Sequence, residues 1–315
     1  MTLTQLSAFV LVARLGSVQA AAHALSITEP AVSQALRSLR AHMSDQLIVR
    51  NGAEMTLTPG GTRLLPIASQ MIALGVEAHS AVRAARGAPH QLRVVASSAM
   101  AEFALAPLID TFSAVIGNSI EIDSGIVSGR DMPVLVASRL ADVALGPRLA
   151  GPAARELDCA PIFRTQLVAV ASAKAMPKGS PSRWPWLVDA SGIDETSDTN
   201  ALLRRLGVPE HRVRVFGSQT AAWESAAAGN GVAVATAHVV GGRLRRHELQ
   251  LVPTTATPMY ADWCVNTLTP DRRSAAASSI REFLGTPRAM QQMRAPGTGV
   301  APSRFRPPVY VTIWN

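Results

Sequence analysis

The sequence is poor in cysteine and in long apolar runs, and each shortage excludes a class of protein. Cys159 and Cys264 are the only cysteines among 315 residues, too few for a disulfide framework, and no Cys/His cluster has the spacing of metal ligands. The N-terminus has no signal-peptide pattern, and no run reaches the roughly 18 apolar residues of a membrane span. We therefore expect a cytoplasmic protein without a metal or a membrane partner.

Motifs of common enzyme classes are missing as well. The sequence contains neither a Gly-x-Ser-x-Gly elbow nor a Gly-x-x-x-x-Gly-Lys phosphate loop. Gly229-Asn230-Gly231 precedes a predicted strand rather than following one, so it lacks the context of a dinucleotide-binding loop. Because no side chains converge on a catalytic pattern, we expect no enzymatic activity and no cofactor.

What the chain does have is apolar bulk and positive charge. With 48% apolar residues, a chain of 315 residues can fill two ordinary cores. Thirty basic residues against 22 acidic ones give a net charge of +8, which favours a polyanionic partner. The basic excess in residues 1–90 is as modest as elsewhere, so charge alone does not locate a nucleic-acid site.

The first sixty residues predict three short helices with turns between them. The first helix ends near Gly16. Its apolar face consists of Leu3, Leu6, Phe9, Val10 and Ala13. Ser17 and Thr28 occupy the N-cap positions of the next two helices, and Pro30 fits the first turn of the third.

The third helix has one apolar and one polar face, and a hairpin follows it. The residues expected to turn inward are Val32, Ala35, Leu36 and Leu39. The polar face consists of Glu29, Ser33, Gln34, Arg37 and Arg40. Farther on, two short runs flank Asn51-Gly52, a strong hairpin signal. Three small helices and a hairpin describe a winged helix-turn-helix.

A heptad pattern marks the helical stretch between Pro59 and about Arg86. Its alternating steps of four and three residues are followed by Leu64, Ala68, Met71, Gly75, Ala78 and Val82. Such a stripe packs on its own domain or pairs with a second helix. We favour pairing, as a homodimer or a dimer of dimers, because no other local segment is available to cover the stripe. Gly87-Ala88-Pro89 then predict a hinge.

From Gln91 onward, short apolar runs alternate with helix-length segments. The predicted strands are residues 92–96, 120–122, 143–145, 167–171, 213–216 and 232–235. This alternation is typical of an α/β fold with a largely parallel sheet. It leaves open whether the sheet is one large unit or two lobes. Residues 296–315 are rich in proline and arginine, which fits a docked strand, a partner-binding arm or partial disorder.

The N-terminal motifs resemble those of LysR-type transcriptional regulators. The similarity runs without a gap through some sixty residues, including Gly16-Ser17-Val18, Ala20-Ala21-Ala22, Thr28-Glu29-Pro30-Ala31-Val32-Ser33 and Leu57-Thr58. Residues 140–145 and 228–233 resemble two recurrent segments of the family's effector domain. The resemblance covers residues 1 to about 290.

The resemblance implies a fold and an order of domains. The family combines a winged helix-turn-helix, a dimerising linker helix and a two-lobed effector domain similar to periplasmic binding proteins, with the ligand between the lobes. On that analogy the domains are residues 1–58 for DNA binding, 59–88 for the linker helix and hinge, 89–290 for effector binding, and 291–315 as a C-terminal extension. Lobe one would comprise residues 91–160 with 265–290, and lobe two residues 161–264.

The third helix supplies the candidate contacts to double-stranded DNA. Recognition requires side chains that reach base edges and donors that hold phosphates. The expected groove-facing residues are Glu29, Ser33, Gln34 and Arg37, and the expected phosphate or minor-groove contacts are Ser17, Thr28, Arg40 and Arg50. Glu29 stands where many relatives have glutamine, and a carboxylate accepts from cytosine N4 but cannot pair with adenine as an amide does.

Strand-to-helix turns supply the candidate effector site. Ser97 and Ser98 follow a predicted strand and precede a helix, so their hydroxyls and free N–H groups suit an oxyanion, and the resemblance points to the same place. Gln219-Thr220 occupy a second such turn, and Ser191 with Thr196 belong to the opposing loop. Ordinary N-capping explains each position equally well. The expected effector is a small molecule, with an anion as one candidate.

Three functions remain to be separated. The leading interpretation is a sequence-specific DNA-binding regulator controlled by a small molecule. The alternative is a small-molecule binding protein whose N-terminal helices serve assembly only, and an α/β enzyme is the third. We interpret Cys159 and Cys264 as two unrelated buried thiols rather than a redox pair.

Overall fold

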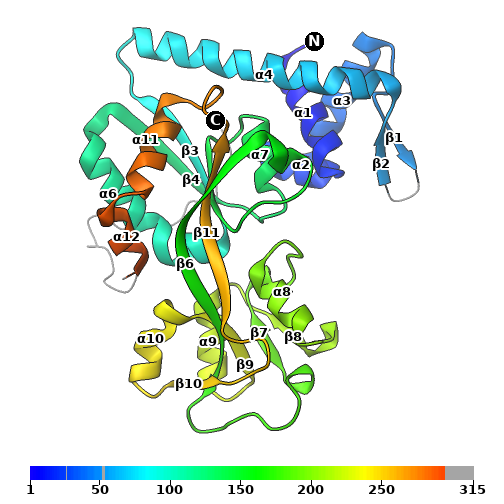
Figure 1. The fold of residues 1–315 in the computed structure, drawn as a ribbon. Helices are drawn as coiled ribbons and strands as arrows, with labels where there is room; N and C mark the ends of the chain where they lie inside the picture. The colour runs from blue at the N-terminus through cyan, green and yellow to red at the C-terminus, as the bar shows by residue number, and fades with distance from the viewer. Residues whose placement is uncertain (26, 52–53, 295–315) are drawn as a thin grey trace.

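A helical head, one long helix and two α/β lobes make up the chain (Figure 1). The structure is a computed structural model that describes residues 1–25, 27–51 and 54–294. The long helix α4, Pro59–Ala85, joins the head to the lobes across the top of the view. The predicted C-terminal extension lies outside the described residues from position 295 onward.

The head is built around its first helix. Leu6 and Phe9 of α1 are fully buried in the head core, and Gly16, with a φ of +67°, ends the helix as predicted. The Ser17 hydroxyl accepts a hydrogen bond from Ala20 N (3.2 Å), which confirms Ser17 as the cap of the second helix. The elements of the head are α1 (Leu3–Leu15), α2 (Val18–Leu25), α3 (Glu29–Met43), β1 (Ile48–Asn51) and β2 (Glu54–Leu57).

The predicted hairpin forms, and its two predicted runs, residues 47–50 and 55–58, pair with each other, with Arg50 opposite Met55. The antiparallel ladder extends one pair farther than predicted, to Asn51 and Glu54. Gly52 of the predicted turn lies outside the described residues. Packing sets the register, because buried Ile48 lies opposite Leu57 against the head core.

The start of α4 lies close to the backbone of Leu47, the residue before β1. A Cβ atom at Gly61 would lie 2.0 Å from the carbonyl oxygen of Leu47. Thr58 N donates to the same oxygen (3.0 Å), and Gly61 N donates to the Thr58 hydroxyl (2.9 Å). The close approach fixes where the long helix leaves the head.

Gly61→Ala is therefore expected to destabilise the protein by about 1–3 kcal/mol, because the added methyl collides with backbone that has little room to move. Thermal unfolding would show the loss as a Tm lower by about 2–4 °C per kcal/mol. The matched control is Gly217→Ala, since no atom lies within 4 Å of a Cβ there. Equal melting temperatures for the two variants would contradict the assignment.

The lobes share one nine-stranded sheet in the order β4-β3-β5-β11-β6-β9-β7-β8, with β10 also paired to β6. The sheet is mixed, so the prediction of a largely parallel sheet was wrong. Parallel pairs occur at β3/β4, β3/β5, β7/β8 and β7/β9, whereas β6 and β11 pair antiparallel with each of their neighbours. The strands are β3 (His90–Ala96), β4 (Ile120–Ile126), β5 (Val143–Gly146), β6 (Leu157–Ser172), β7 (Trp186–Val188), β8 (Val213–Val215), β9 (Val232–Thr236), β10 (Leu249–Val252) and β11 (Met259–Leu268).

Two long strands connect the lobes, which settles the alternative that the sequence left open. β6 and β11 run side by side from one lobe into the other (Figure 1). Each lobe has its own core, around Phe112 and Phe283 in lobe one and around Trp186 and Trp223 in lobe two. The helices are α5 (Ser98–Met100), α6 (Ala106–Ile116), α7 (Met132–Ala137), α11 (Ala275–Leu284) and α12 (Pro287–Arg294) in lobe one, and α8 (Asp198–Arg205), α9 (Gln219–Ala227) and α10 (Ala237–Arg245) in lobe two.

One helix bears on the expectation about membrane spans. The continuous helical stretch Ser98–Ser119, which contains α5 and α6, is long and apolar enough to cross a membrane by length and composition alone. It is not an unbroken apolar run, because Glu102 and Asp110 interrupt it. Met100, Leu108 and Phe112 of this helix are buried in the core of lobe one, where Phe112 packs on Phe283 with ring centroids 5.3 Å apart. Its apolar residues thus serve as core residues.

Candidate functional site

Helix α3 is fixed by its N-cap and by one buried face. The Thr28 hydroxyl accepts a hydrogen bond from Ala31 N (3.4 Å), as the sequence predicts. Val32, Leu36 and Leu39 are buried in the head core. The opposite face of the helix is consequently directed away from the head.

The polar face of α3 is open to solvent. Glu29, Gln34 and Arg37 are exposed, and Ser33 is half-buried. Among the described residues, no hydrogen bond or ion pair engages any of these four side chains. They are available to a molecule outside the protein.

Three of the remaining predicted contact residues make hydrogen bonds within the head. The Arg40 guanidinium donates to the carbonyl oxygens of Gln46 (2.8 Å) and Ile48 (2.9 Å), so Arg40 ties the start of the hairpin to α3. The Ser17 and Thr28 hydroxyls serve as helix caps. Arg50 is exposed on β1.

Asp45 is a head residue that the sequence analysis missed. Its carboxylate accepts from Leu47 N (2.6 Å) and from the Thr58 hydroxyl (2.8 Å). The hydrogen bond from Leu47, with that from Thr58, lowers the pKa of Asp45. Because it links the two ends of the hairpin, this carboxylate fixes the wing relative to α3. An aspartate between a helix and a strand is the local signal that could have identified it.

The heptad stripe of α4 is partly covered by the chain itself. Helix α1 lies along α4, Ala68 is fully buried, and a Cβ at Gly75 would meet Leu3 Cδ1 at 2.5 Å. The premise that no local segment covers the stripe was therefore wrong for Ala68 and Gly75, and Leu64 packs against the same core. Ala78 and Val82 remain exposed, and Met71 is half-buried.

An adjacent face of α4 carries a largely exposed apolar stripe. Ile67 is 53% exposed and Leu74 is 64% exposed, whereas Met71 packs against the head core. This linker stripe follows steps of four and three residues and consists of Ile67, Met71, Leu74, Ala78, Ala81 and Ala85. It shares Met71 and Ala78 with the heptad stripe predicted from the sequence.

Ion pairs and apolar contacts hold the head on lobe one. Arg14 of α1 pairs with Glu156 (3.4 Å), and Glu77 of α4 pairs with Arg139 (3.2 Å). The apolar cluster of the head continues into α7 of lobe one. Figure 1 shows α2 beside α7, whereas α3 and the hairpin lie at the outer end of the molecule.

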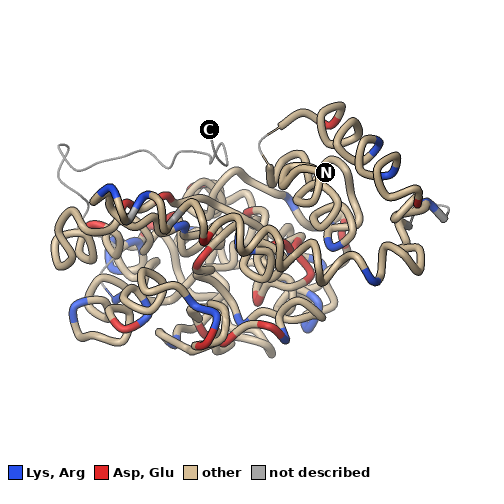
Figure 2. Tube along the Cα trace, turned by 90° about the horizontal axis from the view of Figure 1, so that it is seen from above, with Lys and Arg blue, Asp and Glu red and all other residues tan. Residues whose placement is uncertain are grey.

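Charge is distributed over the whole chain. Figure 2 shows basic and acidic positions over both the head and the lobes, without a single basic face. This agrees with the sequence, in which charge alone does not locate a nucleic-acid site. The head is distinguished by the open polar face of α3 instead.

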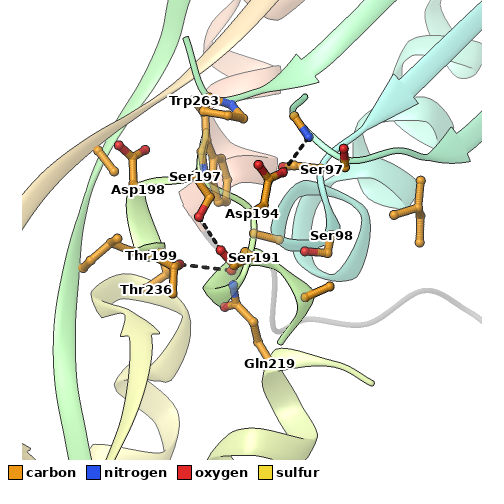
Figure 3. Close-up of a pocket in the computed structure, with 18 of the residues that line it drawn as sticks. Ser97, Ser98, Ser191, Asp194, Ser197, Asp198, Thr199, Gln219, Thr236 and Trp263 are labelled. Atoms are coloured by element: carbon orange, nitrogen blue, oxygen red, sulfur yellow. Dashed lines mark hydrogen bonds between the residues drawn. The ribbon is translucent and has the colours of Figure 1, made fainter. Parts of the chain in front are cut away.

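A pocket of about 200 Å³ lies between the lobes (Figure 3). Hydroxyl and carboxylate side chains dominate its polar lining, and Trp263 of β11 forms part of its wall. The polar residues that line it are Ser97, Ser98, Ser128, Thr165, Ser191, Asp194, Ser197, Asp198, Thr199, Gln219 and Thr236. Both lobes therefore contribute to one cavity, in which these polar groups are set in a mostly apolar lining.

Hydrogen bonds cross directly from one lobe to the other at this pocket. The Ser98 hydroxyl of lobe one donates to Asp189 Oδ2 of lobe two (2.6 Å). Gly129 N of lobe one donates to Asp194 Oδ2 of lobe two (3.0 Å). The lobe arrangement depends in part on these carboxylates.

A third interlobe contact occupies the N-terminus of α9. Glu102 of lobe one accepts hydrogen bonds from Gln219 N and Thr220 N, both at 2.9 Å. N–H groups at such a helix start were predicted from the sequence to bind an anionic effector. In this structure they donate to a carboxylate of the chain itself.

The predicted effector residues fall into two groups. Ser97, Ser98, Ser191 and Gln219 line the pocket. Thr196 and Thr220 lie outside its lining. The Thr196 hydroxyl is turned toward Asp194 (2.6 Å), and Thr220 contributes its N–H to Glu102.

The sequence analysis missed the acidic residues of the pocket. Burial raises the pKa of Asp198, the Asp262 charge raises it further, and Arg205 opposes the shift. Asp189 directly follows β7 and is 2% exposed. A polar residue at the end of a strand is a sequence signal for a site, but β7 has only three residues and was not predicted.

The two cysteines lie on neighbouring strands. Cys264 of β11 lies opposite Pro161, and Cys159 of β6 lies opposite Asn266. Burial above all, together with the neighbouring Cys159, raises the pKa of Cys264 to about 12. Such a thiol stays protonated at neutral pH and reacts poorly as a nucleophile.

Two family models match the chain. The model of the bacterial regulatory helix-turn-helix protein, lysR family, matches residues 3–62, and the LysR substrate binding domain matches residues 85–287. An uncharacterized HTH-type transcriptional regulator of Mycobacterium tuberculosis is 32% identical, with 100% of each chain covered. The HTH-type transcriptional regulator CfxR of Cupriavidus necator is 30% identical, covering 90% of this chain and 91% of CfxR.

Solved structures of full-length regulators share the fold. LysG of Corynebacterium glutamicum with bound effector Arg has a TM-score of 0.52 and 20% identity, with 92% of this chain and 99% of LysG covered. A variant of full-length AphB has a TM-score of 0.58 and 17% identity, with 90% and 98% covered. With the fold, the open face of α3 and the interlobe pocket, these matches show that the chain belongs to the LysR family of DNA-binding transcriptional regulators with an effector-binding domain, and not to an enzyme family.

Proposed function

We propose that residues 1–58 bind duplex DNA through α3, with Glu29, Ser33, Gln34 and Arg37 facing the major groove. The observation that carries this assignment is the polar face of α3, whose four side chains have no hydrogen-bond or ion-pair partner in the described part of the chain. Arg50 on β1 and the helix starts capped by Ser17 and Thr28 are the proposed contacts to the DNA backbone. Arg40 acts by holding the hairpin in place.

The functional unit is proposed to be a homodimer paired through the linker stripe on α4. A second copy of the chain suits this surface, because the stripe keeps heptad spacing and Ile67 and Leu74 are more than half exposed. Residues 59–88 are then the linker helix and hinge. Two heads on one DNA raise the affinity through tethering, without any new contact.

Residues 89–290, with α12 extending to Arg294, are proposed to bind a small-molecule effector in the interlobe pocket. An effector biases the two lobe arrangements only by its differential affinity for them. Ser98–Asp189 and Gly129–Asp194 are the contacts through which it would act. The regulator is proposed to work in the cytosol, where its DNA is located.

Fluorescence anisotropy with DNA that flanks the protein's own coding sequence tests this function. We expect binding that is at least about 1,000-fold tighter than to scrambled DNA and that weakens steeply with added salt. Equal affinity for both DNAs would favour the alternative, a small-molecule binding protein whose head serves assembly only.

A further inference from the structure

The lining of the interlobe pocket is acidic. Asp194 and Asp198 belong to it, whereas no lysine, arginine or histidine is among the described residues that line it. Figure 3 shows the two carboxylates on either side of Ser197. A ligand that enters the pocket therefore meets two carboxylates and no basic side chain in the described lining, although Arg205 lies near enough to act on Asp198 from outside it.

The donors that would hold an anion are already used by the chain. The Ser98 hydroxyl donates to Asp189, and the first N–H groups of α9 donate to Glu102. An anionic effector would have to displace these carboxylates and would still face Asp194 and Asp198. This weighs against the anionic effector that the sequence analysis considered.

Acceptors, in contrast, are left without donors. Gln219 is 7% exposed, lines the pocket, and its Oε1 has no hydrogen-bond partner within the described residues. The Asp198 carboxylate has neither a hydrogen bond nor an ion pair in the same part of the chain. A buried acceptor such as Gln219 Oε1 is costly to leave unpaired, and a ligand with several N–H groups would satisfy it together with the half-buried Asp198 carboxylate.

The wall of the pocket suits a cation as well. Trp263 is 6% exposed and lines the cavity beside the carboxylates (Figure 3). An indole face attracts ammonium and guanidinium groups, most strongly where water is excluded. A volume of about 200 Å³ limits the ligand to a small molecule.

We propose that this pocket takes a small organic cation bearing an ammonium or guanidinium group, with Asp194 and Asp198 as its counter-charges and Gln219 Oε1 as a hydrogen-bond acceptor. The proposal rests on the proposed function in taking the pocket as the effector site. Burial raises the pKa of Asp198, so its charge is disfavoured in the empty pocket and is stabilised when a cation binds.

Calorimetric titration of the full-length protein with compounds of equal chain length tests the charge preference. The three probes differ in charge: putrescine is a dication, 4-aminobutyrate is a zwitterion and succinate is a dianion. We expect putrescine to bind at least about tenfold more tightly than succinate. Binding of 4-aminobutyrate that depends on Asp198 also supports the proposal, because 4-aminobutyrate has an ammonium group at the end where succinate has its second carboxylate. Succinate binding as tightly as putrescine, or no binding by either amine, would overturn it.

Substitutions of single residues test which side chains bind putrescine. Asp198→Asn is expected to weaken putrescine about tenfold or more, whereas Glu195→Gln, an exposed carboxylate on the same loop outside the lining, is expected to change nothing. Asp198→Asn should keep or raise the Tm of the empty protein, since it removes a disfavoured charge. Gln219→Met provides a second variant and should also weaken putrescine. Equal affinities for Asp198→Asn and Glu195→Gln would contradict the proposal.

DNA binding measured in the same preparation distinguishes a failure of the proposed ligand class from a failure of the proposed DNA-binding function. Specific DNA binding with a preference for succinate overturns the ligand class alone. A preference for putrescine without specific DNA binding supports the ligand class and contradicts the proposed function.

Discussion

Leu74→Asp is expected to disrupt the proposed homodimer and to lower the affinity for specific DNA by about 100-fold or more. Leu74 is 64% exposed at the middle of the linker stripe, so the described part of the chain leaves most of this side chain uncovered. Pairing would bury the new carboxylate on both chains without a partner, at a cost of several kcal/mol. Light scattering coupled to size exclusion measures the oligomeric state, and anisotropy measures the DNA affinity.

Leu251→Asp is the matched control for this experiment. Leu251 is also an exposed leucine, at 52%, but it lies on β10 in lobe two. We expect this variant to remain dimeric and to bind DNA as the parent does. A dimer that survives Leu74→Asp would show that the linker stripe is not the pairing surface.

Arg37→Ala is expected to weaken specific DNA binding by about 10- to 100-fold and to leave the dimer intact. Arg37 lies on the exposed face of α3, and a side chain that reads a base edge contributes roughly 1–3 kcal/mol of discrimination. The loss should be smaller on scrambled DNA, because non-specific binding depends on phosphate contacts. Competition titrations with both DNAs measure the ratio.

Arg214→Ala removes an equally exposed arginine from β8 in lobe two and serves as the control. Its effect on specific binding should be small. If both arginine variants lost the same affinity on both DNAs, Arg37 would act through net charge and would not read the groove.

The head shows how far local sequence signals extend. The Thr28 cap, the end of α1 at Gly16 and the buried face of α3 each depend on residues within one or two turns, and the structure confirms all three. The two runs predicted on either side of the wing turn also pair with each other, and packing of Ile48 and Leu57 against the head core supports that register.

The site between the lobes depends on contacts between distant parts of the chain. Glu102 meets the start of α9 across 117 positions of sequence, so no local pattern announces the contact. The prediction found the serines that follow β3 but missed the carboxylates of lobe two. The burial of Ala68 beneath α1 has the same origin. The neighbour that covers a helix face is set by tertiary structure, so the heptad pattern of α4 did not show which part of its apolar stripe would be covered.

The mixed sheet has a similar origin. The sequence analysis found only part of β6 and missed β11, and these are the strands that carry the antiparallel pairs and join the lobes. Strand direction is decided by the partner strand, which lies about a hundred residues away. Alternation of strands and helices identified the α/β class and left the direction of these strands undetermined.

Hydroxyl-radical footprinting of the dimer on the flanking DNA tests most directly whether two α3 helices read one site. We expect two protected patches on one face of the duplex, separated by about one helical turn or a multiple of it, and their disappearance with Leu74→Asp. A single patch, or protection of equal strength on scrambled DNA, would contradict reading by paired α3 helices.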